Sequence, residues 1–279
     1  MKKTTLVSLL AVLVGVLAVA VVSYAAGLTG DQILQKVDEH ETIATQGSLI
    51  SQIRFDNVYS DGTTAYNVFG GLSVKVKGQP DKSLIYFEEP ADVAGTIFLS
   101  IKPEGKDARM WLYLPALGMA KEIVAEQRNQ SFAGSTFSYK DVASRTFADK
   151  YSAKLVGEET VKVGDKSYDC YVLKLTAKPN SDADYPTAKA WVDKNSFLML
   201  KSEDYNSEGK LERTMEVLAI GEFEGNAVAD KMIAKNVIDK SSTTITFLDR
   251  KRPKKPIPDS VFDPNNLSSF DPSEFGFTS

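Results

Sequence analysis

Cysteine and histidine are almost absent from this chain of 279 residues, which holds one of each. The single cysteine, Cys170, excludes an intramolecular disulfide, and its apolar and aromatic neighbours indicate a buried structural thiol. A zinc site would need several Cys and His ligands, and a Ser-His-Asp or Cys-His arrangement would need a histidine beside its nucleophile. His40 falls near the end of an expected helix with no partner motif around it, so we interpret it as a surface or half-buried residue. We therefore expect no metal site and no nucleophilic catalysis.

Motifs for binding nucleotides or nucleic acids are absent as well. The chain has no P-loop and no dinucleotide-binding glycine motif, and its net charge of −4 is spread along the sequence. An acidic chain of this kind is a poor match for nucleic acid. The one basic cluster, Arg250–Lys255, is interrupted by Pro253. We interpret this cluster as a solvated exit from the last strand, with contact to anionic lipid headgroups as the alternative.

Carboxylates occur in pairs, but in loops or where strands are expected to end. The pairs are Glu88 with Glu89, Glu158 with Glu159, and Asp182 with Asp184. We interpret them as solvated turn residues, although two acids at a fixed separation in a cleft, as in a glycosidase, are not excluded by the sequence. We expect no enzyme activity and no cofactor.

The N-terminus has the features of a targeting segment. Lys2 and Lys3 precede the apolar run Leu6–Val22, and residues 23–25 (Ser-Tyr-Ala) form a site of the kind that signal peptidase reads. We predict a cleaved signal peptide over residues 1–25. An uncleaved N-terminal anchor is the alternative, because the run is longer than a typical h-region of a signal peptide and reaches the short end of the roughly 17–25 residues that a membrane-spanning helix needs. Export without disulfides is typical of a bacterial periplasm.

One helix and then many short strands are expected in the rest of the chain. The helix begins at Thr29-Gly30-Asp31, with Thr29 or Asp31 as its cap, and ends before Gly47, with Ile33, Leu34 and Val37 on one face. The expected strands are Ser48–Tyr59, Thr64–Val76, Lys82–Glu88, Gly95–Ile101, Arg109–Leu114, Met119–Val124, Tyr151–Glu158, Lys166–Ala177, Thr187–Val192, Leu198–Tyr205, Lys210–Ile220, Lys231–Asp239 and Ser242–Asp249. Strands at this spacing, with turn signals between them, predict an antiparallel sheet curled into a barrel or half-barrel.

Two local features refine this fold. The paired glycines Gly70-Gly71 inside a strand predict a bulge or a sharp bend. The Pro-rich tail, residues 253–279, follows a domain over residues 26–252 and is expected to dock in part. The tail residues expected to dock are Ile257, Val261, Phe262 and Leu267.

Aromatic side chains gather around the stretch Ala108–Val142. The strand Arg109–Leu114 is apolar on both faces, so each face needs cover other than water. The N-terminal helix and a helical piece around Arg128–Val142 can supply part of it, and an apolar cavity can supply the rest. A plain packed core and a cavity wall therefore both remain open. The candidate wall or rim residues are Phe87, Phe98, Trp111, Tyr113, Phe132, Phe137 and Tyr139.

Two segments of this stretch resemble the signature of a known family. Trp111–Leu117 (WLYLPAL) and Ser131–Val142 (SFAGSTFSYKDV) are similar to the bacterial outer-membrane lipoprotein-sorting protein family, which is related to the periplasmic lipoprotein carrier LolA. Lys82–Phe87, Pro90–Thr96 and Pro258–Phe262 resemble further family segments. The resemblance implies a mainly β fold, an incomplete antiparallel β-barrel wrapped around the N-terminal helix and a short central helical lid. It also implies an apolar cavity for acyl chains.

The chain departs from the family pattern at three places. Gly118–Glu122 stands where the family has a basic run, and Thr136 and Lys140 stand where it usually has acids. Recognition of a headgroup or partner is therefore expected to differ here.

Three functions follow from the residues and the resemblance. The first is a monomeric periplasmic carrier or chaperone for the acyl chains of a lipoprotein or another lipid. It would work with an inner-membrane transporter or an outer-membrane acceptor. The second is a non-enzymatic accessory subunit of an envelope transporter of the resistance-nodulation-division (RND) type, with no ligand of its own. The third, an envelope hydrolase, would need a carboxylate pair inside the concave face.

Overall fold

The computed structural model describes residues 27–143 and 146–278. The signal segment predicted for residues 1–25 lies outside this part of the chain. The described residues hold two α-helices, α1 Gly30–Thr45 and α2 Tyr139–Ala143. The strands are β1 Gly47–Val58, β2 Thr64–Lys75, β3 Asp81–Glu89, β4 Ile97–Lys102, β5 Arg109–Leu114, β6 Met119–Glu122, β7 Tyr151–Val163, β8 Lys166–Ala177, β9 Thr187–Asp193, β10 Met199–Tyr205, β11 Leu211–Phe223, β12 Asn226–Asn236 and β13 Ser241–Lys251. No helix in the described ranges is long and apolar enough to cross a membrane.

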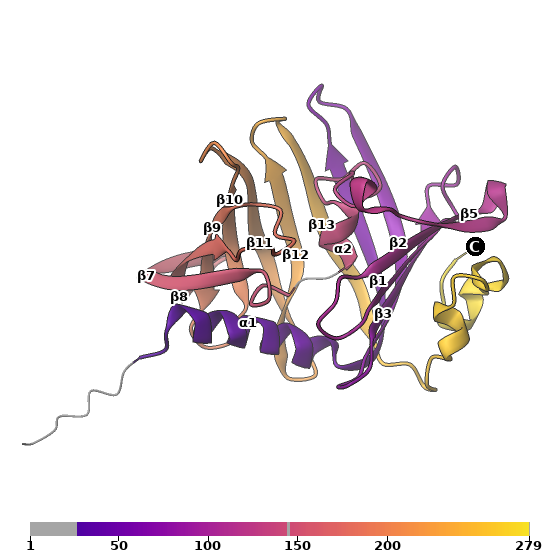
Figure 1. Ribbon diagram of the computed structural model, residues 1–279, viewed down its shortest axis with the longest axis horizontal. Helices are drawn as coiled ribbons and strands as arrows, with labels where there is room; N and C mark the ends of the chain where they lie inside the picture. Colours follow the sequence, from indigo (N-terminus) through magenta and orange to yellow (C-terminus); the bar gives the residue numbers. More distant parts are fainter. Residues whose placement is uncertain (1–26, 144–145, 279) are drawn as a thin grey trace, which may run out of the picture.

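All 13 strands form one antiparallel sheet in the order β6-β5-β4-β3-β2-β1-β13-β12-β11-β10-β9-β8-β7. β6 and β7 are its two edges and do not pair, so the sheet curls without closing (Figure 1). The predicted incomplete barrel is confirmed. The chain runs from the centre of the sheet out to β6, crosses to the opposite edge at β7, and returns strand by strand to β13 beside β1. We call the connection between β6 and β7, residues 123–150, the crossing segment.

Helix α1 begins with a capping box. The Gln32 amide donates to Thr29 Oγ1 at 3.2 Å, and the Thr29 amide donates to Gln32 Oε1 at 2.8 Å. The apolar stripe of Ile33, Leu34 and Val37 is at most 1% exposed. It packs against Leu173, Leu175, Ala188, Ala190 and Val192 on β8 and β9. The helix therefore covers the inner face of the β7–β9 half of the sheet.

The crossing segment is less helical than the sequence predicted over Arg128–Val142. It contains the 3₁₀ turn η2 Ala125–Gln127 and the short helix α2. Between them the chain folds back on itself, because the Phe132 amide donates to the Phe137 carbonyl at 2.7 Å and Ser131 bridges to Ser138. This fold-back directs Phe132 into the aromatic core, where it is 0% exposed.

The start of β12 also differs from the prediction. The sequence placed the strand at Lys231–Asp239, whereas β12 begins at Asn226. Glu224 and Gly225 have φ angles of 50° and 79°, the positive values that a two-residue hairpin turn requires. The turn therefore lies earlier than the composition indicated, and β12 pairs with β11 from Phe223 onward.

The outer face of β1–β5 is covered by the C-terminal tail (Figure 1). The tail forms the turns η3 Asp259–Phe262, η4 Leu267–Ser269 and η5 Pro272–Phe275. Its buried residues Ile257, Phe262, Leu267 and Phe277 pack on Ile50, Leu72, Leu84, Tyr86, Ile97, Leu99 and Trp111. The end of the tail is fixed by the buried carboxylate of Glu88, which accepts hydrogen bonds from the Thr278 amide at 2.9 Å and hydroxyl at 2.7 Å.

The paired glycines of β2 allow this close cover. The pairing with β1 continues without a break through Gly70 and Gly71, and the bulge lies earlier, between Val68 and Phe69 on the β3 side. A Cβ on Gly70 would overlap the ring of Phe277. The close approach of the tail therefore explains why position 70 is a glycine. The bulge predicted at Gly70-Gly71 lies next to these glycines, between Val68 and Phe69.

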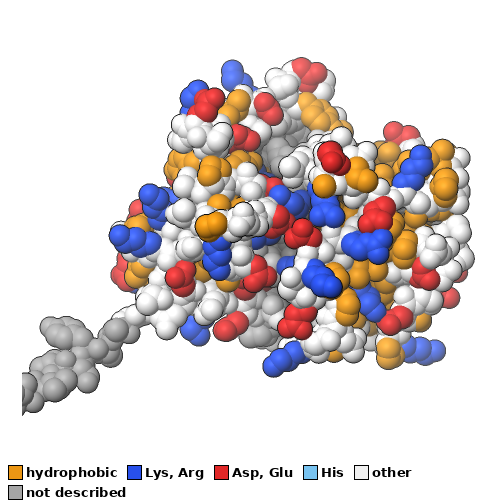
Figure 2. Space-filling model, viewed as in Figure 1, with side chains coloured by type: hydrophobic (Ala, Val, Ile, Leu, Met, Phe, Trp, Pro, Cys, Tyr) orange, Lys and Arg blue, Asp and Glu red, His pale blue; other side chains and the backbone are white. Residues whose placement is uncertain are grey.

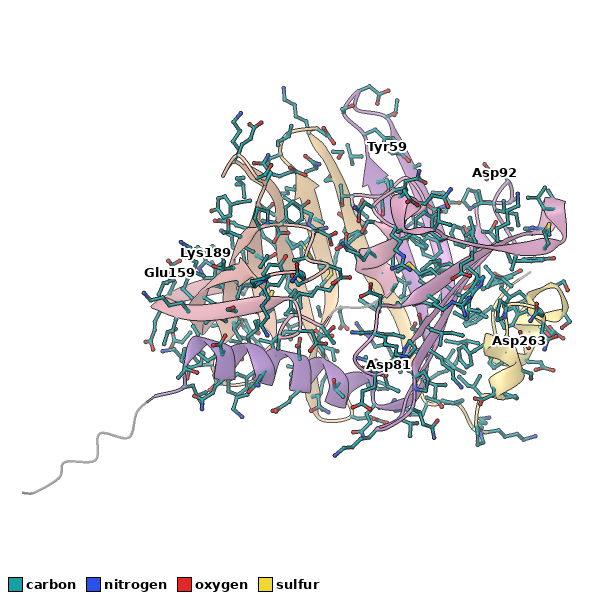
Figure 3. The ribbon with its side chains drawn as sticks, viewed as in Figure 1. Tyr59, Asp81, Asp92, Glu159, Lys189 and Asp263 are labelled. Carbon is teal, nitrogen blue, oxygen red and sulfur yellow. The ribbon has the colours of Figure 1, made fainter. Side chains whose placement is uncertain are left out.

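Charged side chains surround Trp191 on the outer face of the opposite half of the sheet. Trp191 on β9 donates from Nε1 to Glu159 at 2.7 Å, and Lys189 and Lys201 each lie 4.3 Å from its ring centroid. Figure 3 shows Glu159 and Lys189 together at this end of the sheet. Charged side chains of both signs are interspersed over the face seen in Figure 2. The two halves of the sheet therefore differ, since the tail covers the outer face of β1–β5, whereas charged side chains surround the buried Trp191 on the other half.

Candidate functional site

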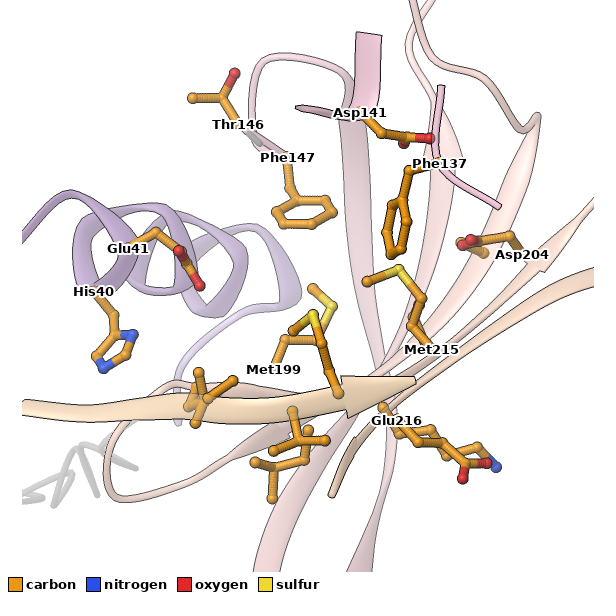
Figure 4. Close-up of a pocket in the computed structure, with 18 of the residues that line it drawn as sticks. His40, Glu41, Phe137, Asp141, Thr146, Phe147, Met199, Asp204, Met215 and Glu216 are labelled. Atoms are coloured by element: carbon orange, nitrogen blue, oxygen red, sulfur yellow. The ribbon is translucent and has the colours of Figure 1, made fainter. Parts of the chain in front are cut away.

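A cavity of about 210 Å³ lies between the inner face of the sheet, α1 and the crossing segment. Its floor comes from β9 to β13, and its sides come from the C-terminal half of α1 and from the crossing segment (Figure 4). The inward positions of β10 and β11 alternate with outward ones, as a half-buried strand requires. This alternation places the side chains of Leu200, Ser202 and Asp204 from β10 beside those of Arg213, Met215 and Val217 from β11.

The middle of the cavity is apolar. Three methionines, Met199, Met215 and Met232, line it together with the aromatic rings of Phe137 and Phe147. In Figure 4 the side chains of Met199, Met215, Phe137 and Phe147 converge on one space. Methionine is unbranched and flexible, so a wall built from it can fit apolar groups of different shapes. This part of the site is suited to holding aliphatic chains.

One end of the cavity is closed by a buried ion triad. Arg213 donates from Nε to Asp204 and from Nη1 to Asp141, each at 2.9 Å. Arg213 and Asp204 are 9% and 7% exposed. Asp141 belongs to α2 and also accepts from the Ser138 amide at 2.9 Å, so the triad joins the crossing segment to β10 and β11.

Burial and charge oppose each other in this triad. Burial acts to raise the pKa of Asp141, but the charge of Arg213 and the hydrogen bonds from Ser138 and Arg213 outweigh it and hold the pKa below its ordinary value. For Asp204 burial prevails, and the pKa is raised. Burial acts to lower the pKa of Arg213, and the two carboxylates raise it above its ordinary value. Arg213 therefore remains charged and is neutralised within the protein.

A second ion pair and two tyrosines flank the triad. Lys140, next to Asp141 in α2, lies 2.5 Å from Asp184 in the loop between β8 and β9. The hydroxyl of Tyr151 donates to the Tyr185 carbonyl at 3.1 Å. Burial raises the pKa of both tyrosines, so both are neutral. Lys150 at the end of the crossing segment lies 3.5 Å from Asp182, so three ion pairs attach this segment to the β7–β11 half of the sheet.

His40 and Glu41 lie at the opposite end of the cavity, on the last turns of α1 (Figure 4). His40 is half-buried, which agrees with one of the two positions expected from the sequence. Its place in a cavity was missed. Helical spacing contains the signal, because position 40 is three residues beyond Val37 and shares the face that α1 buries.

The sequence-predicted wall residues divide into three groups. Phe137 lines the cavity. Phe87, Phe98, Phe132 and Tyr139 form a packed aromatic cluster next to it, and the ring centroid of Phe132 lies 5.6, 5.5 and 5.7 Å from those of the other three. Trp111 and Tyr113 lie on the outer face of the sheet, under the C-terminal tail.

The separation of these residues follows from strand alternation. Phe98 on β4 is opposite Leu112 on β5, whereas Trp111 is opposite Leu99. Neighbours along a strand point to opposite faces. Trp111 and Tyr113 therefore share the outer face with Leu99, and they do not contribute to this cavity.

No group of three or more His, Cys, Asp or Glu residues that could hold a metal ion is found in residues 27–143 and 146–278. The carboxylates of Asp141 and Asp204, which line the cavity, are both paired with Arg213. The arrangement supplies an adaptable apolar space with polar ends.

Comparisons with known proteins agree with this architecture. A family model described as an uncharacterized protein matches residues 79–269. No curated protein matches the chain. A solved outer membrane lipoprotein-sorting protein domain from Vibrio parahaemolyticus is 27% identical, with a TM-score of 0.74 over 86% of this chain and 98% of that one.

Two further solved structures share the fold. A DUF1329 family protein from Desulfovibrio piger is 25% identical, with a TM-score of 0.74 over 83% of this chain and 95% of that one. A LolA superfamily protein from Nitrosomonas europaea is 22% identical, with a TM-score of 0.64 over 85% of this chain and 98% of that one. This last likeness concerns the fold alone.

Proposed function

Since this chain belongs to the bacterial outer-membrane lipoprotein-sorting protein family, related to LolA, we propose that it is a carrier of acyl chains. It acts in the periplasm, without catalysis and as a monomer, and it receives the acyl chains of a lipoprotein or another lipid in its cavity. The observation that carries this proposal is the methionine-lined space between the open sheet, α1 and the crossing segment.

The energetics of this role are simple. Each methylene moved from water into an apolar site contributes about 0.8 kcal/mol, so eight methylenes contribute about 6 kcal/mol. Affinity of that kind needs no specific bond, but it makes release slow. The crossing segment is the part that has to move, and its three ion pairs to the β7–β11 half of the sheet contribute to the cost of that movement. An inner-membrane transporter or an outer-membrane acceptor would supply the contacts that replace them.

Native mass spectrometry of the gently purified protein tests the proposal, together with titration of a fluorescent fatty acyl ester. We expect bound lipid, or binding of the probe. Met215→Trp fills the middle of the cavity with a larger side chain and should reduce probe binding. Leu248→Trp is the matched control, since Leu248 is 49% exposed and does not line the cavity. A protein that binds neither lipid nor probe would contradict the carrier function.

The two unpaired edges of the sheet favour one alternative. β6 and β7 have no neighbouring strand on one side, although the Ala153 amide of β7 donates to Asp31 Oδ1 at 2.7 Å, and an edge strand can accept a strand from a partner. This would serve a non-enzymatic accessory subunit of an RND-type envelope transporter with no ligand of its own. Co-purification with such a transporter, combined with no lipid binding, would favour this function over the carrier.

A further inference from the structure

The basic cluster Arg250–Lys255 divides into two parts in the structure. Its first three residues are each paired with a carboxylate, in the pairs Arg250 with Asp230, Lys251 with Asp249 and Arg252 with Glu224. Lys254 and Lys255 are exposed and form no ion pair within the described ranges. The charge of the first part is therefore neutralised within the protein, and the charge of the second part is not.

The chain that follows Arg252 carries these two lysines past the end of β2. Arg252 donates from Nη1 to the Ser48 carbonyl at 3.2 Å, so it lies at the beginning of β1. Further along, Asp259 accepts from Lys82 Nζ at 2.8 Å, at the beginning of β3. Because β2 lies between β1 and β3, residues 253–258 cross the end of β2 on their way to the tail (Figure 1).

Two further lysines lie at this end of β2. Lys75 is the last residue of β2 and is opposite Gly47, the first residue of β1. Lys77 follows in the turn to β3, and Val76 between them is 40% exposed. Neither lysine forms an ion pair among the residues that the structure describes. The four unpaired lysines form a surface that we call the basic rim: Lys75, Lys77, Lys254 and Lys255.

Acidic side chains balance only part of the charge of the basic rim. In the neighbouring turns Asp259 and Glu224 are already paired, whereas Asp81 and Glu222 form no ion pair within the described ranges. The chain as a whole has a net charge of −4. A local surplus of cations on an acidic protein directs this one surface toward an anionic partner.

The basic rim is next to the end of the cavity that is away from the ion triad. Leu49 of β1 and Phe223 of β11 both line the cavity. Leu49 directly follows Ser48, and the ring centroid of Phe223 lies 5.2 Å from the guanidinium of Arg252. Phe223 and Arg213 are at opposite ends of β11. A partner that contacts the basic rim therefore lies beside this end of the cavity.

We propose that the basic rim binds the surface of an anionic phospholipid bilayer. Each lysine near such a surface is attracted by its negative potential. All four cations are lysines, which are flexible point charges that need no fixed partner geometry, so they suit mobile headgroups better than the fixed carboxylates of a protein. The exposed Val76 meets the same surface. This docking does not depend on the carrier function, but in a carrier it brings one end of the cavity to the lipid.

Vesicle flotation of the purified protein tests the proposal, with vesicles of phosphatidylcholine alone or with about 30% phosphatidylglycerol. At about 50 mM salt we expect about tenfold stronger binding to the anionic vesicles, and most of it should be lost at about 500 mM salt, where exposed charges are screened. Equal binding to the two kinds of vesicle, or no binding to either, would overturn the proposal and leave the carrier function standing.

Neutral substitutions locate the binding surface. In the variant Lys75→Gln, Lys77→Gln, Lys254→Gln, Lys255→Gln, binding to anionic vesicles should be weaker by about 100-fold, since each lysine near the surface contributes roughly threefold to fivefold. The matched control removes the same charge from exposed lysines of the β7–β8 and β12–β13 hairpins, by Lys162→Gln, Lys166→Gln, Lys235→Gln and Lys240→Gln, and should retain binding. All variants share one N-terminus, so any binding by residues 6–22 is equal in all. Equal losses in both variants would overturn the proposal.

A fluorescent label reports which part of the protein touches the bilayer. Val76→Cys can be labelled selectively with an environment-sensitive dye, because Cys170 is 0% exposed. Val237→Cys is the matched control, since Val237 is 42% exposed and lies between β12 and β13, at the opposite end of β13 from the basic rim. On anionic vesicles the emission at position 76 should shift to shorter wavelength, and that at position 237 should not. No shift at position 76 would assign the contact to another surface and overturn the proposal.

Discussion

Asp141 in the crossing segment and Arg213 in β11 form an ion pair of 2.9 Å whose side chains are only 18% and 11% exposed. The two residues are 72 positions apart in the sequence. A charge pair removed from water is costly unless both partners remain in place. The pair therefore specifies where α2 rests on the sheet, and separating it is unfavourable.

Removing the cation should destabilise the fold strongly. Arg213→Leu leaves the carboxylates of Asp141 and Asp204 buried without a partner, and we expect the free energy of unfolding to fall by about 3–5 kcal/mol. Urea denaturation measures this change. Lys210→Leu is the control, because its ion pair with Glu208 is exposed and should contribute less than about 1 kcal/mol. Similar losses in both variants would contradict the role of burial.

The stability of the protein should depend on Asp141 at acid pH. The folded-state pKa of Asp141 is lower than its ordinary value of 3.8, so its stabilising contribution is complete above that value and is lost as the pH falls through the folded-state pKa. In Asp141→Asn, stability should fall less steeply between about pH 5 and pH 2. The pKa of Asp204 is raised, so its contribution has the opposite sign, favouring the folded state at low pH and declining as the pH rises. Asp204→Asn should therefore not flatten the acid limb, and if it does, these assignments are wrong.

A methyl group on Gly70 should displace the end of the tail. In Gly70→Ala the new Cβ overlaps the ring of Phe277, and we expect a loss of about 1–3 kcal/mol in the free energy of unfolding. Gly157→Ala on β7 is the control, since a Cβ there meets nothing within 4 Å. In the double variant with Phe277→Ala the two losses should not add, because the residues touch. Additive losses would show that the contact is unimportant.

Trp111 should affect the tail and leave the cavity intact. It is 8% exposed and packs under the tail, so Trp111→Ala should lower the free energy of unfolding by about 3–5 kcal/mol and expose residues 253–278 to limited proteolysis. Acyl-chain binding measured on the folded variant should match the unmodified protein. Loss of binding in a folded variant would place the ligand on the outer face.

The thiol of Cys170 should react slowly. It is 0% exposed, and burial raises its pKa to about 11. Only the thiolate attacks alkylating agents, so iodoacetamide at about pH 8 should modify the folded protein far more slowly than the denatured protein. Mass spectrometry of timed samples gives both rates, and equal rates would show that the site opens readily.

Alternation and turn residues were sufficient to predict most of the strands. Lys166–Ala177 was predicted with the bounds that β8 has, because the strand alternates and clear turns flank it. The bounds of β12 were predicted wrongly, because Glu224 adopts the left-handed backbone conformation of a turn, which glutamate rarely adopts. The pairing of β1 with β13 joins distant parts of the chain, and local patterns contain no information on it.

The candidate site was harder to predict than the fold. Period-two alternation shows that Phe98 and Leu99 point to opposite faces, but when both faces are apolar it does not show which one is concave. Trp111 was for this reason grouped with Phe98. The residues that line the cavity, such as Met199 and Met215, were not selected because single methionines in strands have no distinctive pattern. Their proximity depends on the curvature of the whole sheet.

The route of the chain has a mechanical consequence. Because the crossing segment is the covalent link between the two edges, β6 and β7, the distance between the edges sets how much slack that segment has, at no more than about 3.3–3.6 Å per residue. A flat sheet of 13 strands, about 4.8 Å apart, would separate its two edges by roughly 60 Å, whereas residues 123–150 could reach about 90–100 Å if extended, so the length of the link does not limit how far the sheet opens. The crossing segment can therefore restrain the curvature of the sheet only through its contacts with both halves, which are the ion pair of Asp141 with Arg213 on one side and the packing of Phe132 against Phe87 and Phe98 on the other.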